Sequence, residues 1–337
     1  MCSHSITHTT FGLPLLPFKN FPDFSHLCLP LGKNIVKNKA GVYISVVAAM
    51  TMWSLTFVWF KIVNEYYGPF TIVFLRLFLS AVILLGISWI SSVLQKIQRG
   101  DLLKFLVLAF IYPVIYFIAE SLGLTMISAS QGAVIISIIP LLVPVGAYLF
   151  LNERVSKLNI VGILISFIGV IIVVMKRDFS FNAAPAGILL MLVAVLSAVG
   201  YTLMVKKLTE RYNAFTITTY QNIIGSVLFL PLFLIFEYRD FLSSDHSVRA
   251  ILHLGYLAVF GSSLAFIFFN YGVKVLGATK TEIFSNIIPV ITAVFAYYVL
   301  GEDLGFQKLF GIAVVLSGLF LAQLKTRKRS YDHLVSP

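Results

Sequence analysis

Two stretches of this chain, residues 128–175 and 277–324, resemble each other along their whole length. Aligned without gaps at a spacing of 149 residues, each stretch is a pair of long apolar runs that a short polar turn separates. The matched positions include Ala129/Ala278, Pro140/Pro289, Ala147/Ala296, Tyr148/Tyr297, Glu153/Glu302, Gly162/Gly311 and Gly169/Gly318. A duplicated apolar hairpin of this kind is typical of membrane proteins that are built from internal repeats.

The composition points to lipid as the solvent. Hydrophobic residues make up 59% of the chain and charged residues only 12%, whereas soluble domains carry about 25% charged residues. The net charge of +11 does not indicate nucleic-acid binding, because the Lys and Arg residues lie in short loops and form no continuous basic face. The two cysteines, Cys2 and Cys28, cannot form a disulfide framework.

From Gly41 onward the chain contains ten apolar runs, each about long enough to cross a bilayer as a helix. The runs are too long for tilted barrel strands and do not alternate polar with apolar residues, which excludes a barrel. Their approximate spans are 41–63, 69–92, 102–122, 128–151, 157–176, 184–206, 214–236, 249–272, 277–300 and 305–325. The predicted fold is therefore an all-α membrane protein with ten transmembrane helices.

The two halves of the chain each hold five of these helices, so the second half enters the membrane with the opposite orientation. The first repeat is predicted at 41–176 and the second at 184–325, and FTI at 70–72 matches FTI at 215–217. Most Lys and Arg residues of the connections fall on the side that holds both chain ends, which predicts cytoplasmic termini. Residues 1–39 are expected to be a disordered tail without a metal motif, and residues 326–337 a basic cytoplasmic tail.

These features resemble the EamA family of the drug/metabolite transporter superfamily. The resemblance rests on IIPLLVPVGAYLFLNE at 138–153, IIPVITAVFAYYVLGE at 287–302 and FLRLFLSAV at 74–82, and it covers about residues 41–325. It implies a ten-helix transporter or exporter of small metabolites with a central cavity between the repeats, but no particular substrate. The chain departs from a symmetric pattern at Gln221, which stands opposite Arg76.

Ionisable residues inside apolar helices are costly and call for a reason. Glu120 is a candidate for proton coupling or for binding a substrate amine, and the alternative is a carboxylate that reaches the outer interface. Arg76 could clamp a substrate carboxylate or phosphate, or it could tie helices together. Glu282 is a second candidate for proton coupling, although near a helix start it could simply interact with the helix dipole. Lys61 is expected to extend its ammonium group to the outer interface.

The duplicated hairpin supplies four further candidates. Glu153 and Glu302 lie at the hairpin turns, where each carboxylate is expected to accept hydrogen bonds from the N–H groups that open the following helix. Pro140 and Pro289 lie within apolar runs and are expected to kink their helices, which in transporters often occurs at a substrate site or hinge.

Polar and aromatic residues in the remaining runs outline a predicted substrate pathway. Tyr112, Tyr116 and Glu120 are spaced by four residues and therefore share one helix face. A mixed apolar, aromatic and amide lining suits an amphipathic metabolite such as an amino acid. The predicted pathway residues are Trp53, Thr56, Arg76, Tyr112, Tyr116, Glu120, Tyr201, Gln221, Asn222, Ser263, Asn270, Ser285 and Asn286.

The leading functional hypothesis is secondary transport by alternating access in a plasma membrane, with a bacterial inner membrane favoured. The alternative is a nucleotide-sugar or phosphorylated-sugar transporter of the same superfamily, and a flippase subunit for a lipid carrier is less favoured. The chain lacks the glycine-rich ATP-binding motif. After Gly41, His occurs only at positions 246, 253 and 333, which disfavours an enzyme. No cofactor or metal is expected. The expected partners are a small-molecule substrate and membrane lipid, and homodimer formation is left open.

Overall fold

The computed structural model describes residues 39–151, 157–174 and 184–323. The predicted tails, 1–39 and 326–337, lie outside these residues except for Lys39. Within the described ranges every regular element is a helix. The first half contains α1 (Lys39–Asn64), α2 (Pro69–Ser91), η3 (Arg99–Asp101), α3 (Leu102–Ala109), η4 (Phe110–Ile115), α4 (Tyr116–Met126), α5 (Ala129–Ile136), α6 (Ile139–Leu151) and α7 (Lys157–Val174). The second half contains α8 (Pro185–Leu208), α9 (Ala214–Leu232), η5 (Phe233–Glu237), α10 (Tyr238–Ser243), α11 (Val248–Tyr256), η6 (Leu257–Leu264), α12 (Ala265–Leu276), α13 (Ala278–Glu282), η7 (Ile283–Ile287), α14 (Ile288–Leu300) and α15 (Phe306–Gln323).

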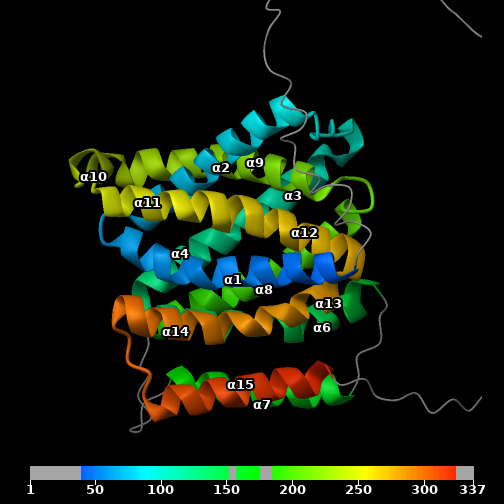
Figure 1. The fold of residues 1–337 in the computed structure, drawn as a ribbon, viewed down its shortest axis with the longest axis vertical. Coiled ribbons are helices and arrows are strands. Elements are labelled where there is room, and N and C mark those ends of the chain that lie inside the picture. The colour runs from blue at the N-terminus through cyan, green and yellow to red at the C-terminus, as the bar shows by residue number, and fades with distance from the viewer. Residues whose placement is uncertain (1–38, 152–156, 175–183, 324–337) are drawn as a thin grey trace, which may run out of the picture. The chain divides into compact units, whose positions relative to one another are not determined.

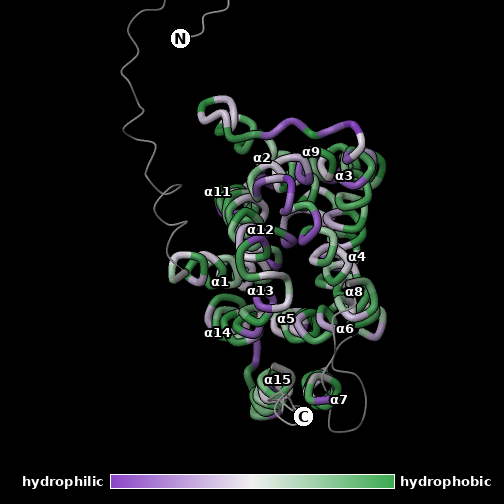
Figure 2. Tube along the Cα trace, turned by 90° about the vertical axis from the view of Figure 1, so that its right-hand side faces the viewer, coloured by the Kyte–Doolittle hydropathy of each residue, from purple (hydrophilic) through white to green (hydrophobic). Residues whose placement is uncertain are grey.

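These elements join into the helices that the sequence predicts. Among the described residues, eight helices are long and apolar enough to cross a membrane, and two shorter apolar helices lie at 160–173 and 306–321. Large apolar side chains such as Trp89, Ile235 and Phe306 are more than 70% exposed on the outside of the bundle, and hydrophobic residues dominate the helices in Figure 2. An outer surface of this kind fits lipid rather than water, so the all-α membrane fold is confirmed.

The last helices of the two halves, α7 and α15, lie side by side (Figures 1 and 2). The Ser166 hydroxyl donates to the Val315 carbonyl at 3.0 Å, and these two residues are counterparts at the 149-residue spacing. A Cβ added at Gly169 would lie 2.9 Å from the Gly311 carbonyl oxygen, and one added at Gly318 would lie 2.7 Å from that of Gly162. The repeat relates these two contacts, because Gly318 is the counterpart of Gly169 and Gly311 is the counterpart of Gly162. The two helices are therefore antiparallel and related by a pseudo-twofold axis between Ser166 and Val315.

Several membrane-crossing segments are interrupted at equivalent places in the two halves. The third segment of each half contains a stretch of π-helix, η4 and η6. The fourth segment breaks just before its proline: Pro140 lies at the start of α6, after the α5 C-cap at Ser137, and Pro289 lies at the start of α14, after η7. A proline is well tolerated in the first turn of a helix. Each proline therefore lies in the first turn of the second part of its broken helix.

Candidate functional site: a cavity between the two repeats

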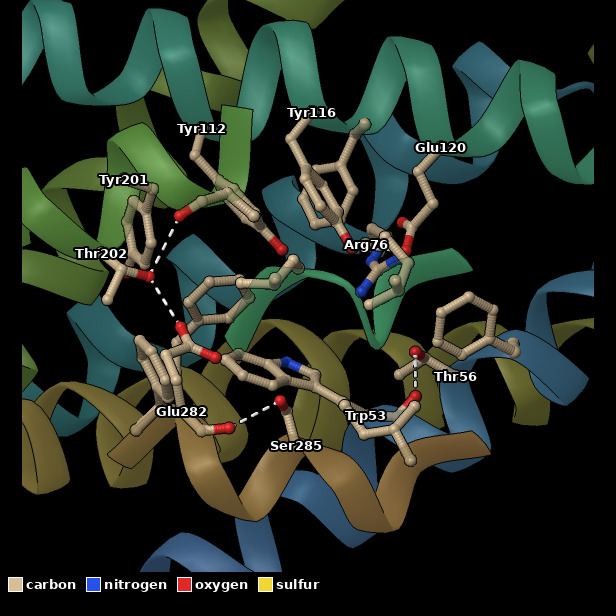
Figure 3. A pocket seen from close by; sticks show the side chains of 18 residues that line it. Trp53, Thr56, Arg76, Tyr112, Tyr116, Glu120, Tyr201, Thr202, Glu282 and Ser285 are labelled. Atoms are coloured by element: carbon tan, nitrogen blue, oxygen red, sulfur yellow. Dashed lines mark hydrogen bonds between the residues drawn. The ribbon is translucent and has the colours of Figure 1, made fainter. Parts of the chain in front are cut away.

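A small cavity of about 50 Å³ lies among helices of both halves. Figure 3 shows Tyr112, Tyr116 and Glu120 along one wall, with Trp53, Glu282 and Ser285 on the facing wall. The lining residues are Trp53, Thr56, Phe57, Arg76, Tyr112, Tyr116, Phe117, Glu120, Ile136, Ile139, Ala198, Tyr201, Thr202, Phe266, Phe269, Glu282, Ser285 and Ile288.

Most of these lining positions are counterparts of one another. Residues 65–72 and 210–217 align at a spacing of 145, which applies to the first helices of each half, and the later helices keep the spacing of 149. Under these spacings the lining residues pair as Trp53/Ala198, Thr56/Tyr201, Phe57/Thr202, Phe117/Phe266, Glu120/Phe269, Ile136/Ser285 and Ile139/Ile288. The cavity therefore lies on the pseudo-twofold axis, where both halves contribute equivalent backbone positions.

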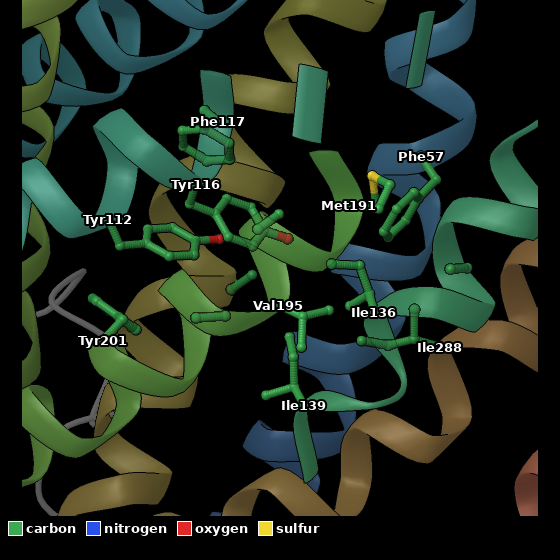
Figure 4. Packing of buried hydrophobic residues seen from close by; sticks show 14 of the residues in the cluster. Phe57, Tyr112, Tyr116, Phe117, Ile136, Ile139, Met191, Val195, Tyr201 and Ile288 are labelled. Carbon is green, nitrogen blue, oxygen red and sulfur yellow. The ribbon is translucent and has the colours of Figure 1, made fainter. Parts of the chain in front are cut away.

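Aromatic rings line much of the cavity, and Figure 4 shows Tyr112, Tyr116 and Phe117 close together in the buried cluster. The Tyr112 ring stacks on the Tyr116 ring with centroids 4.0 Å apart, and it lies 4.7 Å from the Tyr201 ring. The Trp53 ring lies 5.1 Å from the Phe266 ring and 5.0 Å from the Phe269 ring. Rings at these separations attract one another and hold each other in place, so they offer a preformed apolar surface.

One end of the cavity holds the pair Arg76 and Glu120, which are 3% and 8% exposed. The Arg76 Nε donates to the Ser262 hydroxyl at 2.9 Å, and its guanidinium carbon lies 4.5 Å from the centre of the Phe117 ring. The Glu120 carboxylate accepts from the Tyr116 hydroxyl at 2.8 Å and faces the guanidinium group (Figure 3), whose charge attracts it. Much of the binding capacity of Arg76 is therefore used by the protein itself.

The other end holds Glu282, which is 4% exposed. Its Oε1 lies 2.8 Å from the Thr202 hydroxyl. No Lys or Arg within the described ranges forms an ion pair with this carboxylate. Glu282 comes last in α13, a helix of only five residues, and the turns of η7 follow it. The side chain points into the cavity (Figure 3).

The structure brings together many of the residues that were predicted to form the pathway. Trp53, Thr56, Arg76, Tyr112, Tyr116, Glu120, Tyr201 and Ser285 all line the cavity, as does Glu282. Whether they contact a substrate stays a prediction.

The other predicted residues lie behind the cavity wall. The Asn222 amide donates to Ser80 and to the Ser262 carbonyl, and Ser263 bonds Ser80 at 2.6 Å. Gln221, Asn222, Ser263, Asn270 and Asn286 are not among the lining residues. Asn222 and Ser263 thus join helices to one another, and polar side chains commonly do this in membranes.

The lining residues that the sequence interpretation missed are Phe57, Phe117, Ile136, Ile139, Ala198, Thr202, Phe266, Phe269 and Ile288. An apolar side chain in an apolar helix carries no sign of whether it faces lipid or a cavity. Thr202 could have been identified, because it is a polar residue in an apolar helix and adjoins Tyr201, a predicted pathway residue.

The hairpin glutamate Glu302 bonds a different helix from the one expected. Its carboxylate accepts from the Ala129 N–H at 2.7 Å and from the Ser130 N–H at 3.3 Å, which open α5 in the first half, not from the start of α15. Lys61, at the end of α1, donates to the Leu124 carbonyl instead of simply extending to the interface. Glu302 therefore links the two repeats. Glu153, its counterpart, lies outside the described residues.

Comparisons with known proteins give a consistent result. Residues 40–175 and 185–324 each match the model of the EamA-like transporter family. A Bacillus subtilis protein named uncharacterized transporter YetK is 28% identical over 304 residues, covering 88% of this chain and 91% of its own. An uncharacterized transporter from Archaeoglobus fulgidus is 27% identical over 288 residues, covering 84% of this chain and 99% of its own.

A solved crystal structure shares the fold. It superimposes with a TM-score of 0.65 at 15% identity and covers 85% of this chain and 97% of its own. At this identity the likeness concerns the fold alone. Within the described residues no group of three or more His, Cys, Asp or Glu side chains is placed to hold a metal ion.

Proposed function

Because this chain belongs to the EamA-like transporter family, and is thus an integral membrane protein of the drug/metabolite transporter superfamily, we propose that it exports small amphipathic metabolites such as amino acids. The observation that carries this proposal is the cavity on the pseudo-twofold axis, which both repeats line with equivalent positions. A site in that place is reachable from either side of the membrane by equivalent movements of the two halves. Transport is then secondary and proceeds by alternating access.

The contact between Glu302 and α5 supports a gate at one end of this path. It joins the last hairpin of the second half to the start of a helix in the first half, with distances of 2.7 and 3.3 Å to two backbone N–H groups. We propose that this contact is broken when the cavity opens at that end and is made when the cavity opens at the other end, so that the cavity opens to one side at a time.

The lining favours a metabolite with an apolar part over a nucleotide sugar. A diphosphate calls for several cationic partners, and Arg76 is the one Lys or Arg that lines the cavity among the described residues. The two carboxylates, Glu120 and Glu282, are the groups that we propose to exchange protons during transport. The protein resides in a plasma membrane with both termini in the cytoplasm.

Reconstitution of the protein into proteoliposomes with a panel of labelled metabolites tests this function. We expect uptake of an amino acid or a related amphipathic compound above that of protein-free vesicles, and a larger rate when a pH gradient is imposed. Uptake of nucleotide sugars alone would favour the alternative substrate class. Absence of uptake for every compound, with or without the gradient, would contradict the proposal.

Tagging of the two chain ends tests the orientation. A reporter that fluoresces only in the cytoplasm should be active at either terminus. Activity at one terminus alone would mean an odd number of crossings and would contradict the arrangement of two five-helix repeats.

A further inference from the structure

The charged groups of the cavity do not balance. Arg76 and Glu120 face each other at one end (Figure 3), and Arg76 is further held by the Ser262 hydroxyl and the Phe117 ring. Glu282 lies at the other end, and no cation of the described residues forms an ion pair with it. An isolated carboxylate in a low-dielectric site is costly unless it is neutralised. The cavity therefore offers one carboxylate that lacks a positive partner.

The hydrogen bonding of Glu282 is also incomplete. The Thr202 hydroxyl lies 2.8 Å from the Glu282 Oε1 and 3.0 Å from the Ala198 carbonyl oxygen. A hydroxyl group carries a single proton, which it can give fully to only one of these two acceptors. When the proton goes to Ala198, the Glu282 carboxylate has no donor from Thr202. A proton on the carboxyl group, or a cation arriving from the cavity, would supply what is missing.

Aromatic rings line the same cavity as Glu282. The ring of Tyr201, which precedes Thr202 in α8, lies 6.0 Å from the Phe266 ring and 6.4 Å from the Phe269 ring, and both Phe rings pack against Trp53. The faces of aromatic rings attract cations, and ammonium groups are often bound by several rings around a carboxylate. The same rings offer an apolar surface on which the hydrocarbon part of an amine packs.

We propose that Glu282 binds the ammonium group of the transported molecule, and that the substrate is a small amphipathic amine whose apolar part packs on Trp53, Phe266 and Phe269. This inference rests on the proposed function and narrows it. A substrate carboxylate is not required, since Arg76 is already engaged. An ammonium group and a proton compete for the same carboxylate, which couples release of the amine to binding of a proton.

Binding to the purified full-length protein tests this role separately from transport. The probes are 2-phenylethylamine, the neutral 2-phenylethanol and the anionic 3-phenylpropionate, measured by calorimetry in detergent. We expect the amine to bind at least about tenfold more tightly than the other two, because a charged hydrogen-bonded partner is lost with them. E282Q should weaken binding of the amine by about ten- to hundredfold and leave the weak binding of the alcohol unchanged.

Two further variants control this experiment. E282D keeps the charge and should retain most of the amine binding, which separates loss of charge from loss of folding. E210Q removes an exposed carboxylate that does not line the cavity and should bind the amine as the wild type does. Equal binding of the amine by E282Q and the wild type would overturn the inference while leaving transport intact. Failure of the wild type to move any compound in vesicles would instead remove the proposed function.

Discussion

The two halves of the cavity have equivalent backbone positions and different chemistry. Where the first half places Glu120, the second places Phe269, and where the second half places Glu282, the first has Ala133. Both carboxylates thus occur at positions where the duplicated partner is apolar. The difference indicates that the repeat supplies a path that either side of the membrane can reach, whereas single substitutions in one copy supply recognition of the substrate.

Arg76 shows the same asymmetry. Its counterpart at a spacing of 145 is Gln221, which is fully buried in α9 and does not line the cavity. Arg76 is positively charged, whereas the amide of Gln221 is neutral. The cation of the cavity is therefore a property of the first half alone, and removing it should make the two halves more alike.

The largest effect is expected from R76Q, which gives the first half the residue that the second half has. Glu120 would then remain buried without its cation, at a cost of about 3–5 kcal/mol. We expect the uptake rate in proteoliposomes to fall by about a hundredfold, with less folded protein in size-exclusion chromatography. The double variant R76Q/E120Q should recover folding but not uptake. Uptake by R76Q at half the wild-type rate or more would show that the asymmetry is incidental.

The antiparallel pair of α7 and α15 tests the symmetric part of the comparison. A Cβ added at Gly169 would lie 2.6 Å from the Val315 backbone nitrogen, and one added at Gly318 would lie 2.5 Å from the Ser166 hydroxyl oxygen. G169A and G318A should each destabilise the protein by about 1–3 kcal/mol through overpacking, and by similar amounts because the sites are counterparts. Thermal unfolding followed by fluorescence measures both.

Gly86 in α2 provides the matched control for these two variants, since a Cβ added there meets no atom within 4 Å. G86A should leave the unfolding temperature unchanged or raise it slightly, as alanine favours a helix by up to about 1 kcal/mol. A clear difference between G169A and G318A would mean that the two helices do not pack as symmetric partners.

A smaller effect is expected at the gate between the repeats. E302Q keeps the shape of the side chain but removes the charge that the α5 N–H groups face, which should weaken the contact by about 1 kcal/mol. The fraction of molecules whose cavity is open at the α5 end should therefore rise about fivefold. The reporter is the rate of thiol labelling of S130C, at a position that is 1% exposed, in a chain whose Cys2 and Cys28 are replaced by Ser.

E237Q is the control for the gate. Glu237 accepts from the Phe70 and Thr71 N–H groups at the start of α2, so it closes a helix end in the same manner but away from α5. Its loss should not change labelling of S130C. Unchanged labelling of S130C in E302Q would contradict a gate at this contact.

The sequence predicted the fold well because its duplication and its apolar runs are strong signals. It predicted the site less completely for two physical reasons. The sequence left open that Glu282 interacts with a helix dipole, because it lies near a helix start. In the structure it lies past the first turn of α13, and its side chain lines the cavity. Phe266 and Phe269 were missed because a cavity-facing ring and a lipid-facing ring look alike in a sequence.

Several polar residues that were predicted for the pathway do not line the cavity, for a related reason. Asn270 was predicted to line it, but its side chain bonds the Tyr201 hydroxyl and the Thr218 hydroxyl instead. A polar group in an apolar helix shows that the helix has a partner. It does not show whether that partner is a substrate or another helix. The hydrogen-bond geometry distinguishes the two cases, and the sequence alone does not contain it.

The last comparison concerns two equivalent tyrosines at opposite ends of the bundle. Tyr67 and Tyr212 are counterparts at a spacing of 145, and each is 4% exposed. The Tyr212 hydroxyl donates to the buried Asp101 carboxylate at 2.9 Å, whereas the Tyr67 hydroxyl lies 2.9 Å from the His246 Nδ1. Y67F removes the one hydrogen bond to His246. Y212F removes two hydrogen bonds, the one donated to the charged Asp101 carboxylate and the one accepted from the Gln98 N–H at 3.1 Å.

A hydrogen bond to a charged group contributes about 1.5–3 kcal/mol to stability and one between neutral groups about 0.5–1.5 kcal/mol. Y212F should therefore lower the unfolding temperature more than Y67F does. In a D101N background the loss caused by Y212F should shrink, because the acceptor of one of its two hydrogen bonds is then neutral. Equal losses for Y212F and Y67F in the wild-type background would mean that burial of the rings, which the repeat conserves, outweighs the partners, in which the two halves differ.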